Sequence, residues 1–223
     1  MYNKKVFYSE LAYIFGIITI ALGTALLTLA DFGVSMIVAP AYLIHLYVSK
    51  FLPFFTFGMA EYCFQALLII TLIIVLRKFK LSFLFSFVTA VIYGLLLDGF
   101  LFLLSFITFN GDIIRIIYFC LGLIICTFGV SLMFHTYIAP EAYELFVKEI
   151  SSKLNKNINK VKTIYDISSC IIAIILSFIF FGFGKFFGIN IGTIISAIFN
   201  GPLIGLFSMI LDKNFTFIDY IRK

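Results

Sequence analysis

The sequence predicts an all-α membrane protein: a polytopic bundle of six transmembrane helices in two inverted three-helix repeats, with short interfacial or re-entrant helices. The first observation is composition, because 63% of the 223 residues are hydrophobic and only 12% are charged. Soluble domains carry about twice that charged share. The second observation is a set of six long apolar runs, and the third is a similarity between the two halves of the chain.

Six apolar runs are long enough to be membrane spans, since crossing a hydrocarbon core of about 30 Å takes about 20 helical residues. They cover residues 11–31, 58–76, 81–107, 113–135, 164–184 and 189–211. We interpret the first as a retained span, because it lacks the small-residue cleavage site of a signal peptide. Strands of alternating polarity are absent, which favours helices over a β-barrel. The whole chain, 1–223, is predicted to be a single membrane domain.

The basic residues are distributed unevenly between the two predicted sides of the membrane. With the N-terminus in the cytoplasm, thirteen of the 16 lysines and arginines fall on the inner side, and only Lys50, Arg115 and Lys185 fall on the outer side. Cytoplasmic loops of membrane proteins show this enrichment. The pattern predicts a cell-membrane protein with both termini cytoplasmic. It also explains the net charge of +5 without a nucleic-acid partner.

The chain contains a predicted internal duplication, with repeats at 8–108 and 112–215. A shift of about 106 residues places Gly16 and Gly23 on Gly122 and Gly129, and each pair is two helical turns apart. Three spans per repeat is an odd number, so the second repeat enters the membrane in the opposite sense. Secondary transporters use inverted repeats and bind their substrate near the midplane between them.

Small residues recur at every fourth position in the third span of each repeat. This stripe consists of Ser82, Ser86, Ala90, Gly94 and Asp98 in the first repeat, and of Thr193, Ala197, Gly201 and Gly205 in the second. Residues four apart share a helix face, and small side chains let membrane helices approach closely. The glycines predicted to serve helix packing are Gly16, Gly23, Gly94, Gly122, Gly129, Gly192 and Gly201.

The segments that follow the first span of each repeat differ. Residues 34–53 are apolar but interrupted by Pro40 and Pro53, which indicates a re-entrant or interfacial half-helix. A full span there would also invert the distribution of basic residues. Residues 136–160 place apolar side chains every three or four positions among lysines and glutamates. This pattern predicts an amphipathic helix on the cytoplasmic face.

Three stretches carry a resemblance to a known family, namely GTALLTLADFGVSMI after the first span, IYDISSCIIAIILSF, and GINIGTIISAIFNGPLIGLF near the end. Over essentially its whole length the chain resembles the bacterial YitT/YczE-type integral membrane proteins. In that family glycines and a polar residue follow the first span, and a small-residue pattern forms the last. The resemblance implies an integral membrane protein to which a transporter label is loosely attached.

Asp98 is the main candidate for a binding residue. Burying an ionised carboxylate among apolar side chains costs several kcal/mol, and intramembrane acids are commonly functional. Asp98 would carry a proton or bind a cation, with Asn200 and the carbonyl groups loosened by Pro202 as its nearest polar partners. The alternative is a turn that ends the third span at Leu97. For Asn200, the alternative is a cap on a proline kink.

Three further acids are candidates for binding a solute or an ion. Glu61 and Asp166 occupy equivalent places in the two repeats. They act either as gating carboxylates or as favourable negative charge on the first turn of a helix. Asp31, followed by Gly33, lies where the first span ends and an interrupted segment begins. It lines a cavity, as irregular backbone does in transporters, or it simply ends a helix.

These features predict a small secondary transporter or permease for a small solute, with the site between the inverted repeats. The alternative is a membrane binding or accessory protein that sequesters an apolar ligand such as haem or lipid, with His45 or His135 as an axial ligand. Motifs of ATPases, hydrolases and metal enzymes are absent, so we expect no enzyme activity, cofactor or metal. The expected partners are the lipid bilayer and an unknown small solute, and a homo-oligomer is left open.

Overall fold

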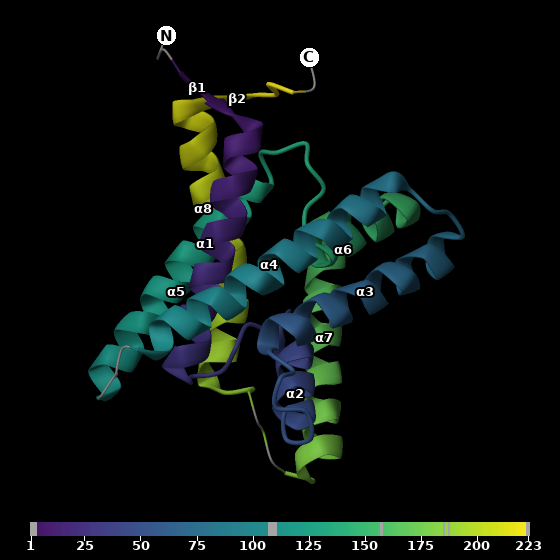
Figure 1. The fold of residues 1–223 in the computed structure, drawn as a ribbon. Coiled ribbons are helices and arrows are strands. Elements are labelled where there is room, and N and C mark those ends of the chain that lie inside the picture. Colours follow the sequence, from purple (N-terminus) through teal and green to yellow (C-terminus); the bar gives the residue numbers. More distant parts are fainter. Residues whose placement is uncertain (1–3, 107–110, 157, 185, 187, 222–223) are drawn as a thin grey trace.

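The computed structural model describes residues 4–106, 111–156, 158–184, 186 and 188–221, and six of the helices in this part of the chain are long and apolar enough to cross a membrane (Figure 1). They are α1 (Ser9–Ala30), α3 (Phe57–Leu76), α4 (Leu81–Ser105), α5 (Asp112–Met133), α7 (Ile158–Phe181) and α8 (Ile191–Asn214). Each overlaps one predicted span, so the all-α class and the six spans are confirmed. The chain is a multi-pass membrane protein. Residue 107 of the third predicted span and Lys185 lie outside the described residues.

Two helix starts follow from side-chain capping. The Thr56 hydroxyl accepts a hydrogen bond from the Met59 backbone N–H at 3.1 Å, where α3 begins. Asn190 and Thr193 form a capping box at the start of α8. Such side chains bond the backbone N–H groups that have no partner inside the helix. The caps therefore fix where these two apolar helices begin.

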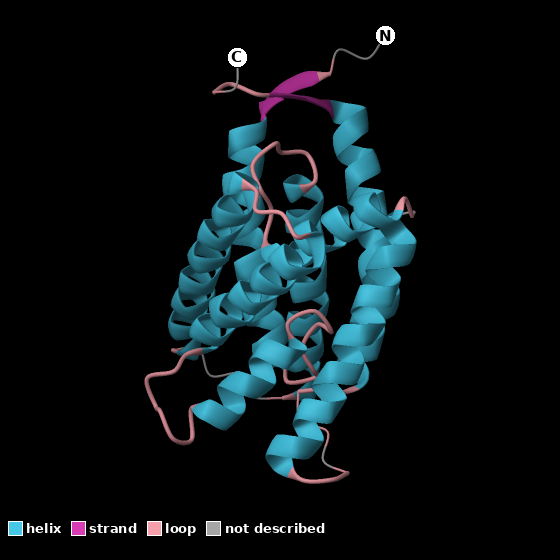
Figure 2. Ribbon diagram, turned by 90° about the vertical axis from the view of Figure 1, so that its right-hand side faces the viewer, coloured by secondary structure: helices cyan, strands magenta, loops and turns pink. Residues whose placement is uncertain are grey.

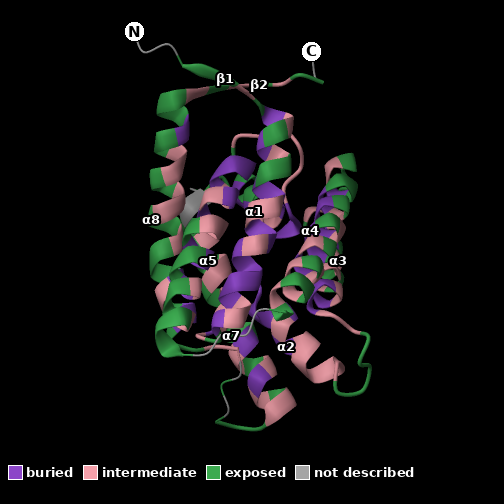
Figure 3. Cartoon of the chain, turned by 60° about the vertical axis from the view of Figure 1, so that its left-hand side comes forward, coloured by how far each residue is buried: buried purple, intermediate pink, exposed green. Residues whose placement is uncertain are grey.

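The centre of the bundle is the antiparallel pair of α1 and α5 (Figure 3). A Cβ added at Gly23 would lie 2.6 Å from the Cys126 backbone nitrogen, and one added at Gly122 would lie 2.9 Å from the Gly23 carbonyl oxygen. Side chains do not fit at these distances, so glycine sets the spacing between the two helices. Around this pair, α4 packs on α1 and α8 packs on α5.

Two short helices, α2 (Ala39–Val48) and α6 (Ala142–Leu154), follow α1 and α5. The ten residues of α2 rise only about 15 Å, so this segment does not span the membrane. Helix α2 contacts α3 and α7, and α6 contacts α3, α4 and α7. The amphipathic helix predicted at 136–160 therefore exists, but its first turn enters the bundle, where Tyr143 is 3% exposed.

Two short parallel strands that the sequence did not predict join the ends of the chain. They are β1 (Lys5–Tyr8) and β2 (Phe215–Ile218), and they lie beyond α1 and α8 at one end of the molecule (Figure 2). The Glu10 carboxylate accepts hydrogen bonds from the backbone N–H groups of Tyr220 at 3.0 Å and Ile221 at 2.9 Å. The end of α8 is thus tied to the start of α1.

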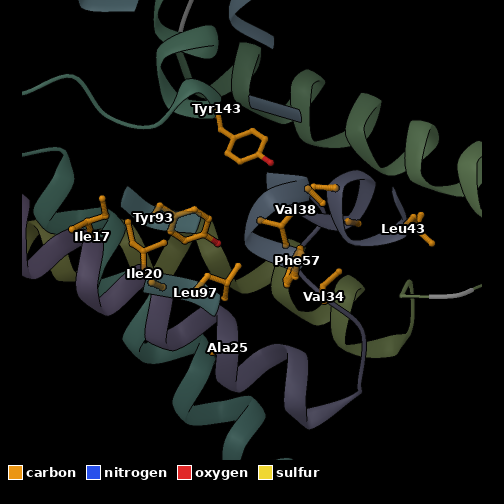
Figure 4. Close-up of a cluster of buried hydrophobic side chains, with 14 of the residues drawn as sticks. Ile17, Ile20, Ala25, Val34, Val38, Leu43, Phe57, Tyr93, Leu97 and Tyr143 are labelled. Atoms are coloured by element: carbon orange, nitrogen blue, oxygen red, sulfur yellow. The ribbon is translucent and has the colours of Figure 1, made fainter. Parts of the chain in front are cut away.

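The largest apolar core lies where α1, α2, α3, α4 and α6 meet, and it includes Ile20, Phe57, Tyr93, Leu97 and Tyr143 (Figure 4). The outer faces of the long helices carry many large apolar residues that are exposed on the surface of the chain (Figure 3). Surfaces of this extent are rare on soluble monomers. They are the faces that contact the lipid bilayer.

Candidate functional site

A cavity of about 680 Å³ lies among helices from both halves of the chain, and its volume is in the range of small-molecule sites, about 300–1,000 Å³. Its walls come from α1, α4, α5, α6, α7, α8 and residues 35–38. The polar residues of its lining include Thr24, Tyr93, Glu141, Glu144, Lys162, Asp166 and Asn200. It extends from the middle of α1 to Phe134 at the end of α5, and therefore toward the end of the bundle that carries both termini.

Behind one wall of the cavity, α3 and α6 share a buried polar network. Glu61 and Gln65 are both 0% exposed, and their spacing of four places them on one face of α3. The Tyr143 hydroxyl donates to Glu61 Oε2 at 2.8 Å, and Gln65 Nε2 donates to Glu141 Oε2 at 3.1 Å. Gln65 Oε1 accepts from the Ala142 backbone N–H at 3.0 Å. The network brings two carboxyl groups to the same wall.

Two tyrosines extend into this region from different helices, Tyr93 from α4 and Tyr143 from α6 (Figure 4). The Tyr93 hydroxyl donates to Thr24 Oγ1 of α1 at 3.1 Å. Both tyrosines are almost fully buried, and both line the cavity. Their rings therefore give the cavity an aromatic surface beside its carboxyl groups.

Glu141 and Glu144 lie at the start of α6, outside the membrane-spanning helices, yet they are removed from bulk water. Burial raises the pKa of the Glu141 carboxyl well above its ordinary value of 4.5, and negative charge on Glu144 and Glu61 raises it further. Burial also raises the pKa of Glu144, against the opposing effect of the Lys162 ammonium group. Desolvation penalises the charged form of an acid, so these surroundings favour a protonated Glu141.

Asp98 does not line the cavity. Its Oδ1 accepts from the Gly58 backbone N–H at 2.8 Å, and its Oδ2 accepts from the Thr56 hydroxyl at 2.5 Å. Helix α4 continues past Leu97, so the predicted turn is wrong, and so is the predicted contact with Asn200. The carboxylate instead bonds a free N–H group at the positive end of α3. Its role in binding a solute or an ion stays a prediction.

Asp31 lies outside the cavity, at the end of α1. Its backbone is in the left-handed conformation with φ of 55°, and its carboxylate pairs with the Arg115 guanidinium at 3.1 Å. Arg115 Nε also donates to the Ala30 carbonyl oxygen at 2.9 Å. A cation here satisfies carbonyl groups that have no partner inside the helix. The geometry fits the helix-ending interpretation, although residues 35–38, a few positions later, line the cavity.

Glu61 and Asp166 lie beyond the first turns of their helices, because α3 begins at Phe57 and α7 at Ile158. The interpretation of these acids as first-turn charges is therefore wrong. Asp166 lines the cavity, and Lys162 Nζ lies 3.6 Å from its Oδ1. Glu61 is not in the lining and lies behind Tyr143. A gating role for either acid stays a prediction.

Asn200 lines the cavity from α8, together with Gly201 and Gly205. The helix continues through Pro202, so the proline does not end it. No atom lies within 4 Å of a Cβ built at Gly201. In this conformation Gly201 and Gly205 of the second stripe therefore border open space, although we expected the stripe to pack against a helix.

The sequence analysis did not identify several residues of the lining and the network as candidates, among them Gln65, Tyr93, Glu141, Glu144 and Lys162. The charges between 141 and 160 indicated a surface helix, which holds only for the later turns of α6. A usable signal is present, since VAPAY at 38–42 and IAPEAY at 138–143 follow the first span of each half. Aligning these two stretches makes α2 and α6 counterparts and shows Glu141 as an acid that the first half lacks.

The two histidines do not line the cavity. His45 Nδ1 lies 2.9 Å from the Phe55 carbonyl oxygen, and His135 Nδ1 lies 2.6 Å from that of Ser131. Among the described residues, no group of three His, Cys, Asp or Glu side chains is arranged to hold a metal ion. The geometry therefore gives no support to the haem-binding alternative.

A family model described as a family of unknown function (DUF6198) matches residues 7–209, which include every segment that lines the cavity. The chain belongs to the DUF6198 family. The family description names no activity, so the function has to be argued from the cavity. No curated protein matches the chain. No solved structure matches it either.

Proposed function

We propose that the protein is a small secondary transporter or permease of the cell membrane, without enzyme activity, that moves a small solute through the cavity between its halves. The observation that carries this proposal is the cavity itself. Its walls come from both halves of the chain, and it reaches from the middle of the bundle toward one end. Transporters built from inverted repeats hold their substrate sites in this location.

The packing of the helices supports the two predicted repeats. The first helices of the two halves, α1 and α5, pack against each other, and α4 lies on α1 as α8 lies on α5. Helix α2 contacts α3 and α7, and its counterpart α6 contacts α7 and α3. Each of these contacts in one half has its equivalent in the other, as expected for inverted repeats at 8–108 and 112–215.

Two contacts lack an equivalent. Helix α4 contacts α6, whereas no contact of this extent joins α8 and α2 among the described residues. Helices α3 and α4 pack closely, whereas α7 and α8, as far as they are described, are not packed together along their lengths. The cavity occupies the space between these two helices. In alternating access, one repeat or bundle moves against the other around a fixed site. The two repeats are arranged differently here, as expected of a transporter that is open to one side of the membrane.

The hydroxyl groups of α4 and α8 also form different hydrogen bonds. On α4, Ser86 donates to the Pro140 carbonyl oxygen at 2.6 Å, and Thr89 donates to that of Ala139 at 3.0 Å. On α8, Thr193 makes the equivalent bond to the Val34 carbonyl oxygen at 2.7 Å. The hydroxyl of Ser196, one turn later, is buried without a hydrogen-bond partner. Helix α8 is therefore docked at its first turn and less firmly held beyond it.

The proposal is tested by counterflow in proteoliposomes, with a broad panel of labelled small solutes and with imposed proton and sodium gradients. A Gly201→Leu variant fills the cavity from α8 and should abolish uptake of any transported solute. Gly99→Leu is the matched control, because Gly99 is also exposed, has no neighbouring atom within 4 Å of a Cβ, and does not line the cavity. A protein that is folded but inert over the whole panel would contradict the proposal.

A further inference from the structure

Acidic side chains outnumber basic ones around the cavity. Glu141 and Glu144 face it from the start of α6, and Asp166 faces it from α7. Glu61 lies directly behind Tyr143 on the same side. Lys162 is the basic residue in the described lining. With every group ionised, the cavity and its immediate surroundings carry excess negative charge.

Contacts within the protein satisfy these carboxyl groups only in part. Glu61 Oε1 and Asp166 Oδ1 are buried without a hydrogen-bond partner, and the ion pair of this group is the one between Lys162 Nζ and Asp166 Oδ1, at 3.6 Å. Glu141 is 5% exposed, and it receives a hydrogen bond on Oε2 from Gln65. Buried charge is costly unless it is paired and hydrogen-bonded. The site therefore needs positive charge from outside the chain, as bound protons or as a cationic ligand.

The cavity is too large and too apolar for a bare metal ion. Ile20, Val130 and Val147 form part of its wall beside the two tyrosines, and its volume is about 680 Å³. No arrangement of three metal-ligating side chains occurs among the described residues. Carboxylates beside aromatic rings suit an ammonium or guanidinium group, which gains from charge pairing and from cation–π contact. The apolar wall suits a hydrocarbon or aromatic body attached to that group.

We propose that the cavity binds a small organic cation, an amine or a guanidine with an apolar body, whose charged group lies between the carboxylates of α6 and Asp166. The inference takes the cavity to be the solute path, and to that extent it rests on the proposed function. Binding and transport are nevertheless separate measurements. The nature of the ligand is therefore open to a test that does not require movement across a membrane.

The binding test uses purified full-length protein in detergent, with unfolding followed by helical circular dichroism. The cationic probes are benzylamine, agmatine and tetramethylammonium, and the matched neutral and anionic probes are benzyl alcohol and benzoate. A ligand that binds only the folded state raises the Tm in a concentration-dependent manner. We expect at least one cation to raise the Tm, and neither benzyl alcohol nor benzoate to do so. Equal or greater stabilisation by benzoate or benzyl alcohol, or no stabilisation by any of the cations, overturns the inference.

The isosteric variants Glu144→Gln and Asp166→Asn test whether the cation binds in the cavity. Each removes one charge and preserves side-chain shape, and we expect the apparent Kd of the stabilising cation to rise roughly tenfold or more, as for the loss of a buried charge partner. Glu149→Gln is the control, because Glu149 is on the same helix, pairs with Lys80 at 2.6 Å and does not line the cavity. An equal loss of affinity in the control overturns the placement of the ligand in the cavity.

The two proposals fail in different ways. If a cation binds with this charge dependence but shows no counterflow in proteoliposomes, the cation site stands and transport fails. If benzoate or a neutral solute shows counterflow that Gly201→Leu abolishes, transport stands and the cation inference is overturned. Counterflow of the stabilising cation that is lost in both Glu144→Gln and Gly201→Leu supports both.

Discussion

Gly94 of α4 faces the backbone of Gly58 in α3 so closely that a Cβ at Gly94 would lie 2.7 Å from the Gly58 carbonyl oxygen. A shift of about 106 residues, which relates the two halves, brings Gly94 to Gly201 in the second half, where nothing lies within 4 Å of such a Cβ. The same stripe of small residues thus packs against a helix in one half and borders a cavity in the other. Alanine substitutions at these two glycines should therefore have opposite effects.

Gly94→Ala should destabilise the protein by about 1–3 kcal/mol, the usual range for overpacking a tight contact. Gly201→Ala should leave stability unchanged or raise it, because alanine favours a helix over glycine by about 1 kcal/mol. Unfolding in detergent, followed by circular dichroism, measures both variants under the same conditions. Equal losses at the two positions would show that α8 is packed as α4 is.

Substitutions of Asp98 distinguish a role in capping α3 from a role in binding a solute or an ion. Its two carboxylate oxygens bond Thr56 and Gly58 at the start of α3. Asp98→Ala removes both bonds and should cost about 1–2 kcal/mol of stability, with cation binding unchanged. Thr56→Val removes one of these bonds together with the cap on the Met59 N–H group, so it should also lower the Tm. An Asp98→Asn variant of full stability that has lost ion coupling would favour the binding role instead.

Glu141 and Glu144 give a pH prediction. Burial raises the pKa of both carboxyl groups in the folded protein above their ordinary value of 4.5. As the pH rises above that value, the unfolded chain loses protons that the folded protein still holds. The stability that these groups contribute at low pH therefore declines until the folded pKa is passed. We expect the Tm of the ligand-free protein to fall as the pH rises above about 5.

A double Glu141→Gln, Glu144→Gln variant should flatten this decline, since amides do not titrate. The amide oxygen that this variant carries at position 141 can still accept the hydrogen bond that Gln65 Nε2 donates to Glu141 at 3.1 Å in the native protein, so we expect the fold to be retained. Glu149→Gln serves as the control and should keep the native slope. A double variant with an unaltered slope would assign the pH dependence to other groups.

The six spans were predictable because their signal is local. Each is an apolar run long enough for the membrane core, and burial against lipid requires no knowledge of neighbouring helices. The short α2 was predictable for a related reason, since Pro40 at its start and Pro53 after it interrupt the run. For these elements the chain's own composition decides the structure.

The candidate site was less predictable, because its contacts are made between segments far apart in sequence. Asp98 bonds Gly58, 40 residues away, and no pattern around either residue indicates that meeting. The lysines after Tyr143 made residues 136–160 resemble a surface helix. The first turn of α6 is buried because Tyr143 and Glu141 form hydrogen bonds with Glu61 and Gln65 of α3. The two parallel strands could not be predicted from the sequence either, because each has only four residues.

The direction in which the cavity opens gives the last prediction. Ser208 lines the cavity from the last third of α8, the helix that ends beside the termini (Figure 1). Lys50 lies two residues after α2, in the loop between α2 and α3. The distribution of basic residues predicts that the termini are cytoplasmic, so we expect Ser208→Cys to react with a charged maleimide only when the reagent is supplied from the cytoplasmic side. Lys50→Cys should react from outside. The background for both variants is a chain in which serine replaces Cys63, Cys120, Cys126 and Cys170.

The cation that stabilises the protein should slow labelling of Ser208→Cys, because it occupies the space that the reagent must cross, and it should leave Lys50→Cys unaffected. Labelling of Ser208→Cys from outside alone would reverse the predicted orientation. Labelling from both sides to the same extent would indicate an open pore. Only one-sided labelling, together with protection by the cation, fits a solute site that is open to a single side of the membrane at a time.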